Sequence, residues 1–207
     1  MARFTRAELD SFRGSQVPDL APGPGSATSV RLLFVGINPG LWTAAVQTHF
    51  AHPASRFYPA LLRAGIIGHP VYPADGMSVT HREHLLGRGI AITNLVRQAT
   101  ARADELSATQ LRAGVDGLRE TVRRLQPVVV AVLGITAFRI AFAEHKAVVG
   151  RQPGDLEGAQ LWVLPNPSGL NAHETIETLA FAYAEPARSA GIELNPMPRP
   201  PGAGTLA

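Results

Sequence analysis

Two short segments, far apart in the chain, bring together the residue types that could do chemistry: GINPG at 36–40 and NPSGL at 166–170. Each follows an apolar, strand-like run, 31–35 in the first case and 161–164 in the second. Because ligands bind at the carboxyl ends of strands in an open α/β sheet, the two segments predict one shared site. Taken alone, Asn38-Pro39-Gly40 is better explained as a plain turn, since all three residues are turn formers. The second segment favours a site.

The elements that must position these segments alternate along the chain, and alternation of strand and helix predicts a parallel sheet covered on both faces. The fold class is therefore α/β, a three-layer α/β/α arrangement with a four-stranded, mainly parallel sheet. We expect strands at 31–37, 89–93, 128–133 and 161–164, and helices at 54–64, 81–87, 107–125, 136–144 and 173–190. Capping-box spacing at Thr5 and Glu8 predicts a further short helix.

Length and composition bound the domain organisation. At 207 residues and 45% hydrophobic content, the chain suits one domain, and its last residues are rich in Pro and Gly and should be disordered. We expect a monomer. We also expect a cytoplasmic location without membrane contact, because there is no apolar run long enough to span a bilayer and no signal-peptide pattern.

Composition also excludes several kinds of chemistry. The absence of cysteine excludes disulfides, thiol nucleophiles and Cys-ligated metal centres. We expect no cofactor, because there is neither a dinucleotide fingerprint nor a phosphate-binding loop. We also expect no metal, because the histidine pairs 49/52 and 81/84 have no third ligand. The net charge of +3 comes with 18 arginines and a single lysine, which is compatible with nucleic acid but equally with a genomic composition bias.

The segment 36–40, together with FAHP at 50–53, Arg56-Phe57 and 166–170, closely resembles the mismatch-specific uracil-DNA glycosylases, the bacterial relatives of thymine-DNA glycosylase. The similarity runs from about residue 31 to 191 and includes TNLV at 93–96 and the stretch 127–134. It implies an enzyme that flips a nucleotide into a pocket and breaks its bond to the sugar. The resemblance implies a catalytic domain at 30–193, between an N-terminal extension at 1–29 and a disordered tail at 194–207, and these two ends inherit nothing from it.

The resemblance also implies roles for residues of this chain. Asn38 positions the attacking water, and because an amide is a poor base the reaction should be dissociative and slow. Phe50 stacks on the flipped base, although a core position would explain it too. The base pocket is completed by Ile37 as a wall, Gly40 with its closely approaching backbone, Asn94 on the pyrimidine edge, and Asn166, which stands where other branches have a His beside the leaving base.

The segment after 166 would contact the DNA. Leu170, an apolar residue at the tip of a loop, is the expected wedge between base steps. Gly169 and Asn171 would meet the opposite guanine, and Ser168 a phosphate. Three positions depart from relatives: Ser55 replaces an Asn, Asn94 a Lys and Ala172 an Arg, so substrate preference could differ.

These expectations combine into one leading function: excision of uracil, and with it etheno-cytosine or thymine, from double-stranded DNA in G·U or related mismatches. Lys146 is the only side-chain amine available for a Schiff base, so we expect a monofunctional enzyme that leaves the strand intact. Two alternatives stay open: a damaged-DNA-binding module without turnover, and a small-molecule hydrolase on a flavodoxin-like sheet. The hydrolase would need a nucleophile or an acid–base pair, whereas the motifs offer Asn, Ser and Gly.

Overall fold

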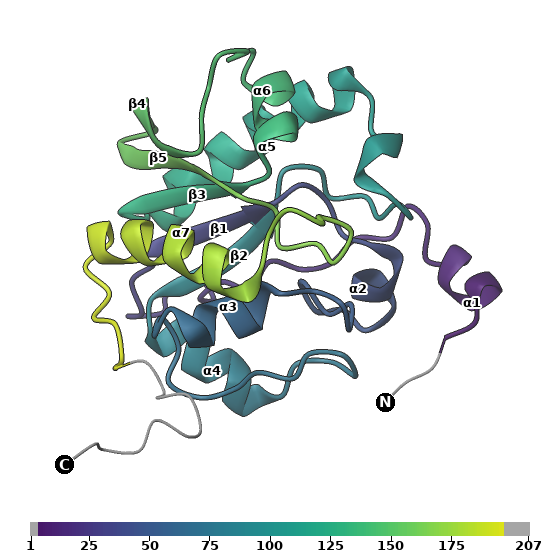
Figure 1. Ribbon diagram of the computed structural model, residues 1–207, viewed down its shortest axis with the longest axis horizontal. Coiled ribbons are helices and arrows are strands. Elements are labelled where there is room, and N and C mark those ends of the chain that lie inside the picture. The colour runs from purple at the N-terminus through teal and green to yellow at the C-terminus, as the bar shows by residue number, and fades with distance from the viewer. Residues whose placement is uncertain (1–3, 197–207) are drawn as a thin grey trace.

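The computed structural model describes residues 4–196 and has a five-stranded sheet at its centre (Figure 1). The strand order is β2-β1-β3-β5-β4. The four predicted strands are all present and mutually parallel: β1 (Leu32–Gly36), β2 (Ile90–Asn94), β3 (Val129–Leu133) and β5 (Ala159–Leu164). The α/β fold class is confirmed, but the predicted strand number was wrong, because β4 (Gly150–Leu156) adds an antiparallel edge strand.

β4 differs from the other strands in ways that explain why it was missed. It contains Pro153 and two glycines, it is largely exposed, and its pairing with β5 is irregular between Arg151 and Asp155. Proline is tolerated in a sheet mainly on edge strands, which is where β4 lies. The turn into β5 has positive φ at both Glu157 (51°) and Gly158 (85°), as a two-residue hairpin of type I′ requires.

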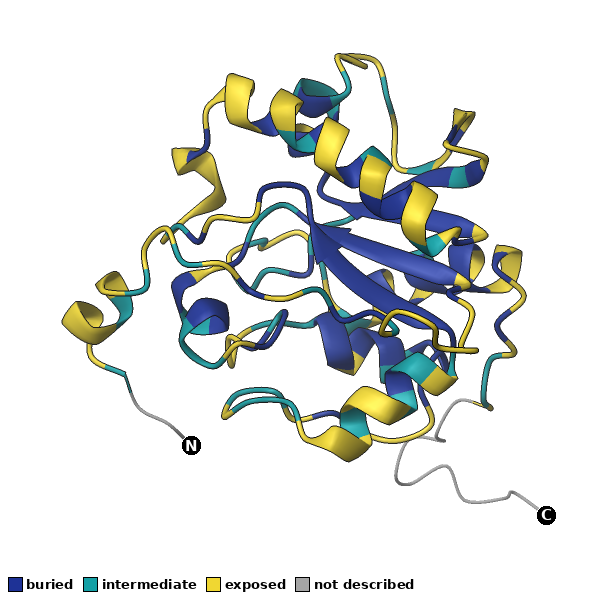
Figure 2. Cartoon of the chain, turned by 180° about the vertical axis from the view of Figure 1, so that it is seen from behind, coloured by how far each residue is buried: buried dark blue, intermediate teal, exposed yellow. Residues whose placement is uncertain are grey.

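Helices cover both faces of the sheet and bury its alternating side chains. On one face lie α3 (Phe57–Arg63), α4 (Val79–Gly87) and α7 (Ile176–Ser189), and on the other lie α5 (Ala108–Leu125) and α6 (Ile135–Ala141). In β1, Leu32 and Phe34 belong to the first core, and Leu33 and Val35 to the second, as the period of two in a strand dictates. Figure 2 shows the parallel strands buried between helices whose outer faces are exposed. The five longer helices that were predicted are confirmed, with small shifts at their ends.

Three short helical segments lie beyond the carboxyl ends of the strands: α1 (Arg6–Asp10), α2 (Leu41–Ala45) and the 3-10 turn η1 (Ala103–Glu105) (Figure 1). The capping box of Thr5 and Glu8 is formed, so the short N-terminal helix is confirmed. Neither α2 nor η1 was predicted from the sequence. All three gather at the edge of the sheet where the two motif segments emerge.

The N-terminal segment 14–21 is packed onto the sheet. Leu20 exchanges two backbone hydrogen bonds with Ile92 of β2, and Ala99 bonds the backbone of Gly14 and Ser15. Val17 and Leu20 are buried. Part of the predicted extension at 1–29 therefore holds core residues, and the predicted boundary itself stays a prediction.

At the other end of the chain, Leu194 packs against the core, and Asn195 donates two hydrogen bonds to the carbonyl oxygen of Gly65. Most of the predicted tail, residues 197–207, lies outside the described residues. Within residues 4–196, none of the helices has the length and apolar character to cross a membrane.

Candidate active site

The carboxyl ends of β1, β2 and β5 open into a cleft of about 740 Å³. Of the ten site residues predicted from the sequence, nine line this cleft: Ile37, Asn38, Gly40, Phe50, Asn94, Asn166, Ser168, Gly169 and Leu170. Asn171 lies outside the lining. Among the described residues of the lining only Asp10 and Glu105 carry carboxylates, and both pair with Arg13 at the rim. The side chains of Asn38, Asn94 and Asn166 therefore place three amides in the cleft, beside arginine, histidine and hydroxyl side chains.

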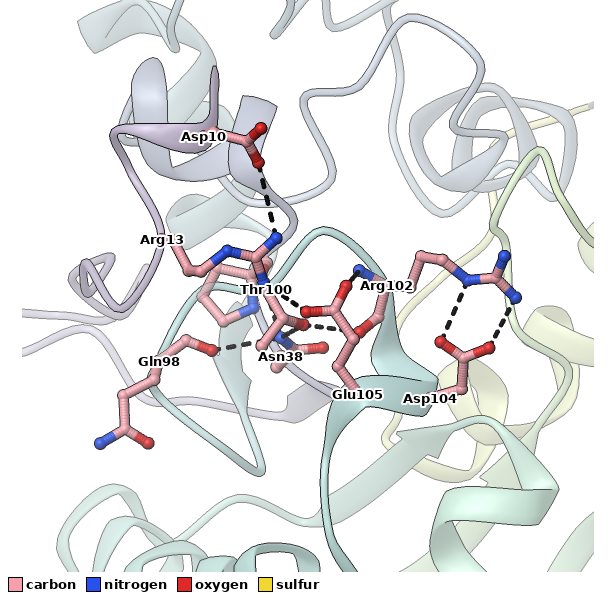
Figure 3. Close-up of polar contacts among 9 residues, drawn as sticks. Asp10, Arg13, Asn38, Gln98, Thr100, Arg102, Asp104 and Glu105 are labelled. Carbon is pink, nitrogen blue, oxygen red and sulfur yellow. Dashed lines mark hydrogen bonds and ion pairs between the residues drawn. The ribbon is translucent and has the colours of Figure 1, made fainter. Parts of the chain in front are cut away.

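The amide of Asn38 has a fixed orientation. Its Nδ2 lies 2.7 Å from Thr100 Oγ1, 3.1 Å from the carbonyl oxygen of Gln98 and 3.1 Å from that of Pro39 (Figure 3). Thr100 Oγ1 donates its own proton to the carbonyl oxygen of Arg102, so it must accept from Asn38. Three acceptors around Nδ2 leave Oδ1 on the other side, where it accepts nothing from residues 4–196. Asn38 therefore offers the cleft a hydrogen-bond acceptor.

The polar contacts behind Asn38 continue outward to α1, as Figure 3 shows. Thr100 donates a hydrogen bond to the carbonyl oxygen of Arg102, and the backbone N–H of Arg102 donates to the carboxylate of Glu105 at 2.9 Å. Glu105 pairs with Arg13, which also meets Asp10 of α1 at 3.5 Å. Exposed ion pairs of this kind contribute little to stability. They nevertheless place α1 beside the loop that holds Asn38.

Asn94, the last residue of β2, lies opposite Gly36 of β1 and is buried. Its Nδ2 lies 3.2 Å from Nδ1 of His49, which is itself buried. A Cβ at Gly36 would lie 2.4 Å from Oδ1 of Asn94 and 3.3 Å from Cζ of Phe50. Gly36 therefore makes the space in which these two side chains meet.

Phe50 is half-buried, and its ring stacks on Phe57 with the ring centroids 4.0 Å apart and an angle of 26° between the planes. Its backbone has φ of 55°, which is uncommon for a bulky residue. Backbone held in such a conformation is concentrated at functional sites. Phe50 belongs both to the core, through Phe57, and to the lining of the cleft, so each of the two predicted placements describes part of it.

The amide of Asn166 is also oriented. Its Oδ1 accepts the backbone N–H of Ser168 at 2.9 Å, and this bond leaves Nδ2 as the free end. Nδ2 lies beside Gly134, 3.7 Å from where a Cβ of that residue would be. Asn166 therefore offers the cleft a donor, whereas Asn38 offers an acceptor.

The loop from 166 to 174 is held by Arg56. Its backbone N–H donates to Pro167, and its guanidinium donates to the carbonyl oxygens of Gly169, Asn171 and Glu174 at 2.8 to 3.4 Å. At the tip of this loop Leu170 is 84% exposed. An apolar side chain so exposed, on a loop so firmly tied, is suited to contact a partner.

Other residues of this loop serve its own structure. A Cβ at Gly169 would lie 2.7 Å from the carbonyl oxygen of Ala54, so close packing accounts for this glycine. Asn171 donates through Nδ2 to the carbonyl oxygen of Asn166 at 3.1 Å. Ser168 Oγ accepts the backbone N–H of Leu170 at 3.3 Å, and its own proton can still be donated. The DNA contacts predicted for these residues stay predictions.

Sequence reasoning missed several residues that build the site: Gly36, His49, Arg56 and Thr100. Arg56 and Gly36 stood inside quoted motifs without a role, and the sequence contains no signal for His49 or Thr100. Histidines 69, 81 and 84 lie close together, with the rings of 69 and 84 at 3.8 Å between centroids. Across the part of the chain that is described, no group of three or more His, Cys, Asp or Glu could hold a metal ion.

Comparison with solved structures finds the same fold in a Methanosarcina acetivorans protein, determined by NMR in solution and named as a candidate uracil DNA glycosylase. The match has a TM-score of 0.57 and covers 86% of this chain and 98% of that one. At 16% identity it concerns the fold alone. The family model of the uracil DNA glycosylase superfamily matches residues 22–185. Because that match spans well over half of the chain, the protein belongs to the uracil DNA glycosylase superfamily.

Proposed function

We propose that the protein is a monofunctional, mismatch-directed DNA glycosylase that hydrolyses the N-glycosidic bond of uracil opposite guanine. The observation that carries the proposal is the convergence of Asn38, Asn94 and Asn166, from the ends of β1, β2 and β5, around one cleft that also contains Phe50. A planar base with polar edges needs an aromatic surface and directed hydrogen bonds, and this cleft offers both.

Asn38 holds the water. Its free Oδ1 accepts a hydrogen bond from the water and turns an oxygen lone pair of the water toward C1′ of the flipped nucleotide. An amide does not take the proton, so the bond between C1′ and N1 breaks first and its electron pair leaves with uracil. Water then adds to the sugar cation and releases its proton to solvent. Without a carboxylate beside the cation, we expect slow chemistry.

Asn166 and Phe50 act on the base itself. The Nδ2 group of Asn166 donates to an oxygen of the departing uracil anion, which stabilises the charge that develops as the bond breaks. The face of Phe50 that does not stack on Phe57 meets the flipped ring. Stacking of a base on an aromatic side chain is worth about 1–3 kcal/mol.

Leu170 enters the space that the flipped nucleotide leaves, and the four hydrogen bonds from Arg56 stiffen the loop for this insertion. Ser168 has a hydroxyl proton free for a phosphate, and Gly169 and Asn171 face the opposite strand.

Lys146 supports the monofunctional assignment. It lies exposed in the turn after α6 and is outside the cleft lining, so no lysine is placed to attack the sugar. The reaction therefore ends with an intact strand that carries an abasic site.

The test is single-turnover release of uracil from a G·U duplex, with A·U, G·T and single-stranded uracil compared, and alkali used to reveal abasic sites. We expect cleavage of G·U only after alkali, and no release by Asn38→Ala although it binds the duplex. Gly117→Ala, an exposed change in α5 far from the cleft, is the control. Binding of G·U duplex without release from any substrate would instead favour a damaged-DNA-binding module. Equal rates for Asn38→Ala and wild type would refute the site.

A further inference from the structure

In the wall of the cleft, a buried histidine connects Asn94 to the N-terminal segment. His49 is 4% exposed, and its Nε2 lies 3.0 Å from the carbonyl oxygen of Pro18. Its Nδ1 lies 3.2 Å from Nδ2 of Asn94. The backbone of His49 is held as well, because its carbonyl oxygen accepts the hydroxyl proton of buried Tyr58 at 3.0 Å. The imidazole is therefore a fixed link between Pro18 and the cleft.

The carbonyl group of Pro18 determines which nitrogen of His49 carries the proton. A carbonyl oxygen only accepts, so Nε2 must be the donor, and in a neutral imidazole Nδ1 is then an acceptor. Burial lowers the pKa of His49 and favours the neutral ring. This effect outweighs the hydrogen bond to Pro18 and the charge of Asp19, which both raise the pKa, while Arg97 and Arg82 lower it further. An acceptor at Nδ1 requires the N–H end of the Asn94 amide.

The other end of that amide, Oδ1, consequently lies toward Gly36 and the cleft, where the missing Cβ of Gly36 leaves it room. One proton of Nδ2 is used by His49, and the second meets no hydrogen-bond acceptor among residues 4–196. Asn94 thus presents an acceptor and a donor side by side. The order of the two is decided by His49, not by Asn94 itself.

We infer that His49 is a positioning residue that fixes Asn94 to read a pyrimidine with an N–H at ring position 3, so that the cleft selects uracil over etheno-cytosine and cytosine. The inference rests on the proposed function and narrows its substrate. Uracil offers N3–H to Oδ1 of Asn94 and O4 to the free proton of Nδ2. Etheno-cytosine has no proton at that position, and cytosine has a lone pair there that opposes Oδ1.

Two substitutions of His49 separate its two hydrogen bonds. His49→Gln keeps an N–H near the position of Nε2 for Pro18 but has no acceptor at the position of Nδ1. His49→Asn keeps an oxygen near the position of Nδ1 for Asn94 but no longer reaches Pro18. Both lose one buried hydrogen bond, so both should be destabilised to a similar extent. Val122→Ala, on the buried face of α5 and outside the cleft lining, serves as a control variant that is destabilised without a change near Asn94.

The measurement is the single-turnover excision rate for G·U and for guanine–etheno-cytosine duplexes, with Tm recorded for each variant. We expect wild type to prefer uracil by at least about 30-fold, since a site built to bond an N–H rejects a base without it. The His49→Gln variant should excise uracil about 30-fold more slowly and lose most of the preference, because the side-chain amide of Asn94 can then flip and exchange Oδ1 and Nδ2. His49→Asn should stay within about fivefold of wild type, and Val122→Ala should keep the preference.

An independent measurement is the ¹⁵N NMR spectrum of His49, which should show the neutral ring protonated at Nε2 at pH 7. A proton on Nδ1, or a wild type that prefers etheno-cytosine, would overturn the inference. So would a His49→Gln variant with the wild-type rate and preference, and in that case the proposed function would stand. A wild type that releases no base from either duplex would overturn both.

Discussion

Replacing Gly36 by alanine should disable the cleft while leaving the fold in place. The new Cβ would lie 2.4 Å from Oδ1 of Asn94 and 3.3 Å from Cζ of Phe50. An ordinary carbon–oxygen contact is about 3.4 Å, so the amide of Asn94 would have to retreat by about 1 Å. Asn94 ends a buried strand and cannot move as a whole, so its side chain must rotate and lose the hydrogen bond to His49.

The size of the effect can be estimated from these contacts. A misplacement of about 1 Å in a binding group can lower a rate about 100-fold. Leaving the buried Asn94 and His49 groups without their shared bond costs about 1–3 kcal/mol, and the strain on the rotamer adds about 1 kcal/mol. We therefore expect Gly36→Ala to excise uracil about 100-fold more slowly and to unfold with about 2–4 kcal/mol less free energy in urea.

Gly117→Ala is the matched control, because a Cβ there meets no atom within 4 Å. In a helix interior this change should stabilise the protein by about 0.5–1 kcal/mol and leave excision unchanged. Wild-type excision by a folded Gly36→Ala variant would refute the reasoning, since it would mean that the position of Asn94 beside Gly36 does not matter.

Three further predictions concern Thr100, Arg56 and His49, which hold other residues of the candidate site in place. Thr100→Val removes the 2.7 Å acceptor of Asn38 and should slow base release about 10-fold at unchanged duplex affinity, whereas Thr100→Ser should retain the rate. In the Arg56→Lys variant one ammonium group cannot bond all of the loop carbonyl oxygens at once, so the rate of excision from G·U duplex should fall about 10-fold. An equal loss of rate on single-stranded uracil would exclude an effect that acts through Leu170. Burial lowers the pKa of His49 in the folded protein, so below about pH 6.5 this residue binds a proton more readily in the unfolded chain than in the folded one. As the pH falls, His49 should therefore reduce the free energy of unfolding by up to about 1.4 kcal/mol per pH unit. His49→Asn should remove that component of the slope in urea titrations at pH 7 to 5.

The parallel sheet could be predicted because its strands are continuous apolar runs that only a doubly covered sheet accommodates. β4 could not, since it is exposed, contains Pro153 and pairs irregularly. Its hairpin left one signal that could have been used, the Glu157-Gly158 turn before an apolar strand. α2 was missed because its five residues are too few for a helical period to be visible.

The candidate site, like the fold, has residues that could be predicted from the sequence and residues that could not. Asn38 and Asn166 could be found because each follows a strand in a recognisable motif. The segment 14–21 offered no motif, yet it bonds Ala99 behind Asn38, pairs with β2 and supplies the carbonyl group of Pro18 to His49. Such contacts are backbone hydrogen bonds, which any residue can make, so side-chain patterns do not reveal them.

What the sequence leaves undecided is the direction of each amide. An asparagine can present either a donor or an acceptor, and the residue type does not say which. In the folded chain three neighbouring groups decide: the Gln98 carbonyl oxygen for Asn38, the Ser168 N–H for Asn166, and His49 for Asn94. On the proposed function, the selectivity of the cleft for a base would therefore depend on the groups that orient these three amides as much as on the amides themselves.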